Sequence, residues 1–145
     1  MATTIFVTPR CYNDAARRRK RRLFFGIDGG HLEAQALARK IIDVLSDKQA
    51  EDILLLDISG VASFADYFVI ASAGSDRQIQ AILDAVDETI EAEGIRPMGR
   101  EGKFDSGWVL LDYGDVIVHL FAPEERAYYD LEGLWHSAVP VVRIQ

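Results

Sequence analysis

The chain has 145 residues, of which 49% are hydrophobic and 10% aromatic, proportions typical of one globular domain. It holds no run of about 20 apolar residues, which excludes a transmembrane helix and predicts a soluble protein. Because Cys11 is the one cysteine, no disulfide can form within the chain, which fits a reducing compartment.

The net charge of −7 is divided unevenly along the chain. Residues 1–30 carry seven basic and two acidic side chains, so residues 31–145 carry nine basic and 21 acidic ones, a net charge of −12. Such an acidic body repels phosphate backbones, which argues against unaided nucleic-acid binding by the folded part. Its natural complement is a basic surface, toward which long-range attraction would steer it.

Residues 1–30 show no sustained apolar period, and we expect a basic, disordered tail there, followed by one domain over residues 31–145. The basic block Arg17–Arg22 is compatible with a nucleic-acid contact or an Arg-rich targeting segment. A solvated extension is the interpretation that the pattern favours over both.

A helical stripe begins the domain and predicts a first helix from His31 to about Asp47. Its apolar members are Leu32, Ala36, Leu37, Ile41, Val44 and Leu45. Two short apolar runs, Ile53–Asp57 and Tyr67–Ala71, predict buried strands. A second helix is expected to follow, with Ser75 as its N-cap. The capping partner is Gln78, the apolar stripe runs from Ile79 to Ile90, and Gly94 ends the helix.

Another short strand is expected near residues 95–98, and residues 99–107 have the composition of an exposed loop. Two runs then meet at Gly114 and predict a tight hairpin, Trp108–Tyr113 and Asp115–Phe121. One face of this hairpin is wholly aliphatic, and we expect the helices to cover it: Val109, Leu111, Val116, Val118 and Leu120. The mixed face is only partly apolar, so exposure of this face is compatible with the pattern: Trp108, Leu110, Asp112, Ile117, His119 and Phe121.

Pro123 and two glutamates begin a last helical segment, whose apolar side would be formed by Tyr128, Leu131, Leu134 and Trp135. Residues 139–144 either add an edge strand or remain loose. This element order predicts an α/β fold in which a mixed β-sheet carries helices packed mainly on one side.

A Gly74-Ser75 turn between a strand and a helix could bind phosphate through free amide groups. Nucleotidyltransferases use such a pair, but they also need two carboxylates on a following strand to hold Mg²⁺. The next acids here belong to the helix, so a turn with a helix cap is the favoured interpretation. A metal site would have to combine dispersed residues without zinc-type spacing: His119, His136, Asp112, Asp115 and Asp130. We expect no metal, no cofactor and no nucleophilic catalysis.

Six aromatic residues stand between positions 108 and 135, too many for all of them to lie in the core: Trp108, Tyr113, Phe121, Tyr128, Tyr129 and Trp135. Aromatic side chains that reach a surface often anchor a protein partner. We therefore expect part of this cluster to be exposed, with Leu131 and Trp135 as its best core candidates.

Several ungapped blocks carry a family resemblance: DIS at 57–59, FADYFVIASAGSDRQ at 64–78, EG at 101–102, GWVLLDYGDVIVH at 107–119 and RAYYDLEGLW at 126–135. In this order they closely resemble the ribosomal silencing factor (Iojap) family over about residues 31–138. The resemblance implies a nucleotidyltransferase-like α/β fold without catalytic carboxylates, and a protein that is not an enzyme. The basic tail has no counterpart in this pattern.

The resemblance also implies binding to ribosomal protein fourteen of the large subunit, at the intersubunit face. The bound protein would block the small subunit and repress translation under nutrient limitation, with no direct nucleic-acid contact required and no membrane. A homodimer is possible within the family, and the implied location is cytoplasmic, or organellar if the tail is a transit segment.

The matching blocks give these expected partner-binding residues: Trp108, Asp112, Tyr113, His119, Arg126, Tyr128 and Tyr129. Two other hypotheses remain open at this point. One is a phosphate-handling enzyme at the Gly74-Ser75 turn, and the other is an RNA-binding module that works through residues 17–22.

Overall fold

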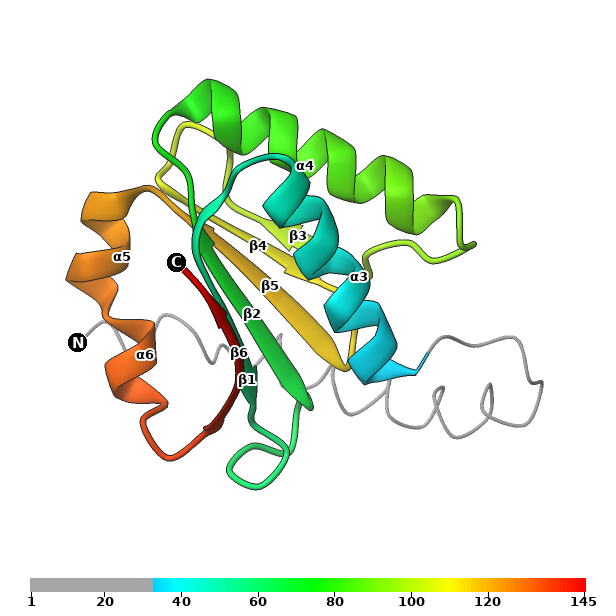
Figure 1. The fold of residues 1–145 in the computed structure, drawn as a ribbon, viewed down its shortest axis with the longest axis vertical. Coiled ribbons are helices and arrows are strands. Elements are labelled where there is room, and N and C mark those ends of the chain that lie inside the picture. The colour runs from blue at the N-terminus through cyan, green and yellow to red at the C-terminus, as the bar shows by residue number, and fades with distance from the viewer. Residues whose placement is uncertain (1–32) are drawn as a thin grey trace.

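The computed structural model describes residues 33–145, which form a six-stranded sheet between two unequal helical layers (Figure 1). In chain order the elements are α3 (Ala34–Asp47), β1 (Glu51–Asp57), β2 (Tyr67–Ser72), α4 (Asp76–Glu91), β3 (Gly99–Glu101), β4 (Trp108–Asp112), β5 (Val116–Phe121), α5 (Pro123–Tyr129), α6 (Leu131–Leu134) and β6 (Val139–Ile144). The predictions for the basic tail, Cys11 and the start of the first helix lie outside the described residues.

The strand order is β3-β4-β5-β2-β1-β6, and the sheet is mixed, as expected. β2 and β5 pair in parallel, whereas the other neighbours pair antiparallel. A parallel pair needs a long crossover connection, and the segment containing α4 provides it. Residues 139–144 form an edge strand along β1, which decides between the two alternatives left open for them.

The two long helices cover one face of the sheet, and α3 and α4 lie side by side there (Figure 1). Their apolar stripes pack on the aliphatic face of the hairpin, so the predicted assignment of that face is confirmed. Val109, Leu111 and Val118 are completely buried in this cluster. Burial of this aliphatic area is the main favourable term for the fold.

Most of the mixed face of the hairpin is buried as well. Trp108 is half-buried, and for the other members of this face the expectation of exposure is wrong. Ile117, His119 and Phe121 are at most 4% exposed, and Leu110 is 7% exposed. The reason is a second, smaller cluster, in which the short helices and the segment after β1 fold over this face. Its covering residues are Ala62, Phe64, Ala65, Leu131, Leu134 and Trp135.

The last helical segment is broken in two, which the sequence did not predict. Asp130 adopts a left-handed backbone conformation, with φ 44° and ψ 54°, between α5 and α6. Its carboxylate accepts a hydrogen bond from the Gly133 N–H at 3.2 Å and so caps α6. Because of the break, Leu131 packs inside while Tyr128, expected on the apolar side, is 78% exposed.

The strand expected at residues 95–98 lies at Gly99–Glu101, inside the segment expected to be a loop. This strand has no apolar pattern of its own, because both Arg100 and Glu101 are exposed. It forms by pairing with β4, where Gly99 lies opposite Asp112. Among residues 33–145, no helix combines the length and apolar character needed to cross a bilayer.

The start of α4 confirms the predicted cap. The Ser75 hydroxyl accepts a hydrogen bond from the Gln78 N–H at 3.1 Å, and the Gln78 side chain accepts one from the Gly74 N–H at 2.8 Å. The Gly74 amide is therefore already paired within the protein. Gly94 follows α4 with φ 78°, a conformation that glycine adopts without strain.

Replacing Ser75 with Ala is expected to lower the free energy of unfolding by about 1 kcal/mol, because one N-terminal amide of α4 loses its partner. Ser75→Asp should retain most of the stability, since aspartate is an equally good cap. Urea unfolding of both variants measures the difference. Equal stability of Ser75→Ala and the parent protein would contradict the role given to the cap.

Candidate functional site

Trp108 is the centre of an aromatic cluster on the face covered by the short helices. Its ring stacks on Phe121 with centroids 5.0 Å apart, and the Tyr129 ring lies 4.7 Å away. Its indole N–H donates a hydrogen bond to His119 Nδ1 at 3.2 Å. The register places Trp108 opposite Phe121 at the end of the hairpin, so β4, β5 and α5 together build this cluster.

His119 is completely buried in this cluster, with its ring edge-on to Phe68 at 4.9 Å. Desolvation lowers its pKa from 6.5 to about 3, so the imidazole is neutral at physiological pH. Because Nδ1 accepts the Trp108 hydrogen bond, the proton of the neutral ring resides on Nε2. A neutral side chain at this depth supports the surface but does not touch a partner.

The two tyrosines at the end of α5 extend the aromatic cluster to the protein surface. Tyr129 is half-buried against Trp108, and Tyr128 packs edge-on to Tyr129 with centroids 5.1 Å apart. At 78% exposure, Tyr128 is the most exposed large hydrophobic side chain among the described residues. Tilted and edge-on ring contacts therefore connect the buried His119, through Trp108 and Tyr129, to the exposed Tyr128, and we call these four residues the aromatic stack.

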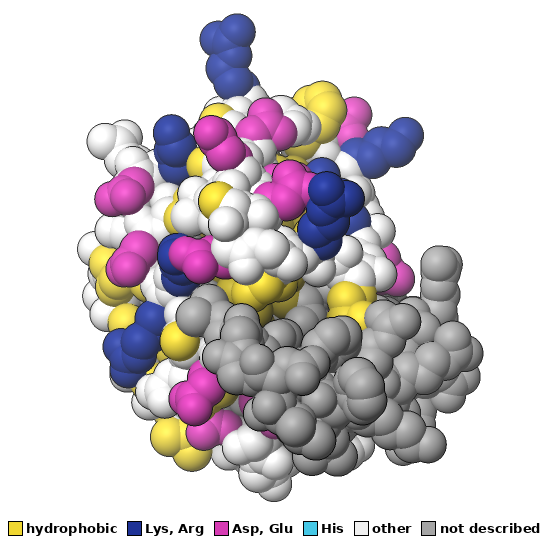
Figure 2. Space-filling model, turned by 90° about the vertical axis from the view of Figure 1, so that its right-hand side faces the viewer, with side chains coloured by type: hydrophobic (Ala, Val, Ile, Leu, Met, Phe, Trp, Pro, Cys, Tyr) yellow, Lys and Arg dark blue, Asp and Glu magenta, His cyan; other side chains and the backbone are white. Residues whose placement is uncertain are grey.

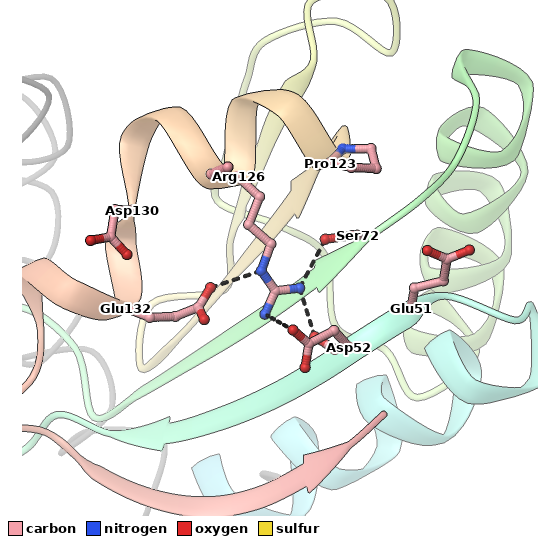
Figure 3. A pocket seen from close by; sticks show the side chains of 8 residues that line it. Glu51, Asp52, Ser72, Pro123, Arg126, Asp130 and Glu132 are labelled. Atoms are coloured by element: carbon pink, nitrogen blue, oxygen red, sulfur yellow. Dashed lines mark hydrogen bonds and ion pairs between the residues drawn. The ribbon is translucent and has the colours of Figure 1, made fainter.

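Arg126 projects from the other side of α5 into the fold, and its side chain is only 9% exposed. Its Nε donates to Glu132 at 2.7 Å, and its Nη1 donates to the Asp52 carbonyl at 2.7 Å and to the Ser72 hydroxyl at 2.9 Å. Figure 3 shows the guanidinium reaching from α5 toward Asp52 and Ser72, with Glu132 beside it. Arg126 thus joins α5 to β1, β2 and α6.

Asp112 and Tyr113 lie at the opposite end of β4 from Trp108. The Asp112 carboxylate accepts a hydrogen bond from the Gly114 N–H at 2.8 Å and stabilises the hairpin turn. Tyr113 is 8% exposed and packs in the cluster under the long helices, where burial raises the pKa of its hydroxyl. Both residues shape the hairpin and lie apart from the tyrosines of α5.

The structure separates the seven predicted site residues by position. Asp112 and Tyr113 lie at one end of β4, and the other five lie around Trp108 and α5. Trp108, His119, Tyr128 and Tyr129 form the aromatic stack, and Arg126 anchors the helix that carries both tyrosines. Burial restricts direct contact with a partner to Tyr128 and, in part, to Trp108 and Tyr129. The sequence contains no signal for Asp52 and Glu132, which hold Arg126, because neither stands at a helical or strand spacing from it.

The geometry gives little support to phosphate binding at the Gly74-Ser75 turn or to a metal site. The Gly74-Ser75 turn has its amide and hydroxyl engaged in the cap, and Asp76 puts a negative charge in the first turn of α4, which disfavours phosphate. Within residues 33–145, no three His, Cys, Asp or Glu side chains gather where a metal ion could be held. The basic block Arg17–Arg22 lies outside this part of the chain.

Charged side chains of both signs are interspersed on the visible face in Figure 2. Exposed ion pairs around α4 join Arg96 to Glu91 and Arg100 to Asp87. Such surface pairs contribute little to stability, typically about 0–1 kcal/mol. The charge of the body is therefore more relevant to which partners approach it than to how firmly it folds.

The family model and the bacterial relatives that match this chain carry similar descriptions. A family model described as "Ribosomal silencing factor during starvation" matches residues 31–145. A Bacillus subtilis protein, "Ribosomal silencing factor RsfS", is 48% identical over 92 residues, which cover 63% of this chain and 78% of the relative. A protein of the same name from Halalkalibacterium halodurans is 39% identical over 111 residues, covering 77% and 94%.

A plant relative and two solved structures also match this chain. The Zea mays "Protein Iojap, chloroplastic" is 33% identical over 109 residues, covering 75% of this chain and 47% of the relative. A crystal structure of a Chromobacterium violaceum protein superposes with a TM-score of 0.69 at 37% identity, covering 72% of this chain and 88% of that one. One from Bacillus halodurans has a TM-score of 0.66 at 37% identity, covering 74% and 98%.

The burial of His119 predicts an acid-sensitive fold. Between pH 6.5 and about 3 the unfolded chain binds a proton at this residue that the folded chain does not, so stability falls as the pH falls. One such proton contributes up to about 1.4 kcal/mol per pH unit. His119→Gln keeps an acceptor for Trp108 but does not titrate, and its urea unfolding should show a shallower pH dependence. Parallel pH profiles for the two proteins would contradict this account.

The stack also predicts unequal costs for removing its rings. Trp108→Ala should lower the free energy of unfolding by about 2–4 kcal/mol, because it leaves a cavity beside Phe121 and His119. Tyr128→Ala should change it by less than about 0.5 kcal/mol, because the exposed ring supports little else. Urea midpoints of the two variants measure both values. Comparable losses in the two would show that Tyr128 belongs to the folded core.

Proposed function

The chain belongs to the ribosomal silencing factor family, and on that premise we propose that it prevents the two ribosomal subunits from joining. In this proposal it binds ribosomal protein fourteen of the large subunit at the intersubunit face. The bound protein occupies space that the small subunit needs, and translation is repressed when nutrients are limiting. The names of the relatives support ribosome association and regulation of translation.

The exposure of Tyr128 is the observation that carries the proposal. A tyrosine offers a large apolar ring with a polar tip, and a few such anchors often provide most of the binding energy of an interface. Here the ring stands 78% exposed on α5 and packs edge-on against Tyr129, which packs on Trp108, and this contact favours one orientation of the ring before a partner arrives. A pre-positioned anchor loses less conformational entropy on binding.

Charge supports the same partner class. Residues 31–145 carry a net charge of −12, and the exposed Glu124 lies one helical turn before Tyr128. A ribosomal protein that binds RNA carries a positively charged surface, which is opposite in sign to this domain. Attraction between them would speed the encounter and would fix the orientation of the complex more than it would raise its affinity.

Blocking a subunit surface requires no reactive side chain, and three ionisable groups near the proposed contact are buried or already paired. His119 is neutral and sealed, and the carboxylates Asp52 and Glu132 are occupied with Arg126, so we propose no catalytic step. Silencing then requires only that the complex persists longer than the time between encounters of the two subunits. The domain 31–145 would make the contact, in the cytoplasm or, as for the chloroplastic relatives, in an organelle.

Tyr128→Ala is expected to weaken binding to purified large subunits by about tenfold or more, the scale of an interface hot spot. Met98→Ala is the matched control, because Met98 is also a large exposed side chain, at 41%, but precedes β3 on the far edge of the sheet. Cosedimentation of each variant with isolated large subunits gives the affinities. If Tyr128→Ala binds as well as the control, the surface proposed here is not the contact.

A further inference from the structure

A cavity of about 310 Å³ opens on the side of α5 that carries Arg126 (Figure 3). It lies where the first residues of β1 and the last of β2 meet α5 and α6. The lining residues that matter here are Glu51, Asp52, Arg126, Ala127, Asp130 and Glu132. Because Ala127 precedes Tyr128 on α5, a partner seated on the tyrosine would also lie near the cavity mouth.

The cavity is acidic, with four carboxylates lining it against one guanidinium. Arg126 is engaged with Asp52 and Glu132, and the Asp130 carboxylate caps α6. Arg143 adds an ion pair to Asp52 at 3.2 Å. Glu51 is different, because its carboxylate is exposed and makes no hydrogen bond or ion pair within residues 33–145. Its negative charge is therefore not used to hold the fold.

Two buried polar atoms at the cavity also lack hydrogen-bond partners. Arg126 Nη2 lies 3.4 Å from Asp52 Oδ2, which is an ion pair without a hydrogen bond. Asp52 Oδ1 accepts no hydrogen bond, although Arg143 Nη2 lies 3.2 Å from it in an ion pair. Asp52 holds a left-handed backbone with φ 46°, beside an irregularity in the pairing of β1 with β2. Of these two atoms only the carboxylate oxygen can accept a hydrogen bond, so a guest that donates hydrogen bonds would gain a contact at Asp52 Oδ1.

We propose that this cavity receives one lysine or arginine side chain of the protein partner, an inference that rests on the proposed function for the partner's class. A volume near the lower limit of ligand pockets suits a single side chain better than a nucleotide, and the surplus of carboxylates repels phosphate. The aliphatic stem would lie along Pro123 and Ala127, and the cationic head would reach Glu51 and Asp52.

The test uses the full chain and purified large subunits, with two pocket variants that leave the fold unchanged. Glu51→Gln removes the unpaired charge, and Ala127→Met fills the cavity from an exposed helix position without changing charge. Their matched controls are Glu88→Gln and Ala81→Met, at exposed positions of α4. We expect each pocket variant to bind between about three- and tenfold more weakly than the parent protein, and the controls to bind unchanged.

The expected salt response is specific. The affinity of Glu51→Gln should depend less on salt than that of the parent protein, because one charge contact has been removed. If both pocket variants bind like the parent while Tyr128→Ala does not, the cavity is not a contact and the proposed function survives. If a single pocket variant is impaired, a basic side chain inside the cavity is ruled out. If even the parent protein fails to bind large subunits, the proposed function fails first.

Discussion

The guanidinium of Arg126 holds the second helical layer on the sheet. α5 has seven residues and α6 has four, lengths at which an isolated helix is not stable in water. Hydrogen bonds from Arg126 to the Asp52 carbonyl and the Ser72 hydroxyl, with the ion pair to Glu132, join both helices to the strands beneath. Losing one partner of a fully buried ion pair typically costs about 3–5 kcal/mol, and this pair is buried on the Arg126 side and partly exposed on the Glu132 side. The direction of Tyr128 depends on this arrangement.

The two helical layers bury different kinds of side chain on the two faces of the sheet. α3 and α4 bury a mainly aliphatic face, and packing there stabilises the domain. The thin layer of α5 and α6 covers the other face with aromatic rings, which connect the neutral His119 in the interior to the exposed Tyr128. In the proposed function, recognition falls on this thinner layer, which packs on the core beneath it. The acidic cavity beside Arg126 extends the same surface.

Local patterns in the sequence predicted much of this fold. The stripes of α3 and α4, the Ser75 cap, the hairpin at Gly114 and its aliphatic face all follow from spacings of a few residues. The features that were missed depend on distant partners. β3 exists because it pairs with β4, the mixed face is buried because α6 returns over it, and the Asp52 carbonyl that receives Arg126 is 74 residues away. For the site, the sequence predicted the aromatic cluster but not which of its members reach the surface.

In the proposed function, the protein bound to the large subunit excludes the small one. Large subunits are first incubated with increasing amounts of the protein, small subunits are then added, and light scattering reports the fraction that joins. The account predicts that joining falls in proportion to the occupied fraction of large subunits, measured on the same samples. Large subunits that are saturated with the protein and still join small subunits to the full extent would contradict it.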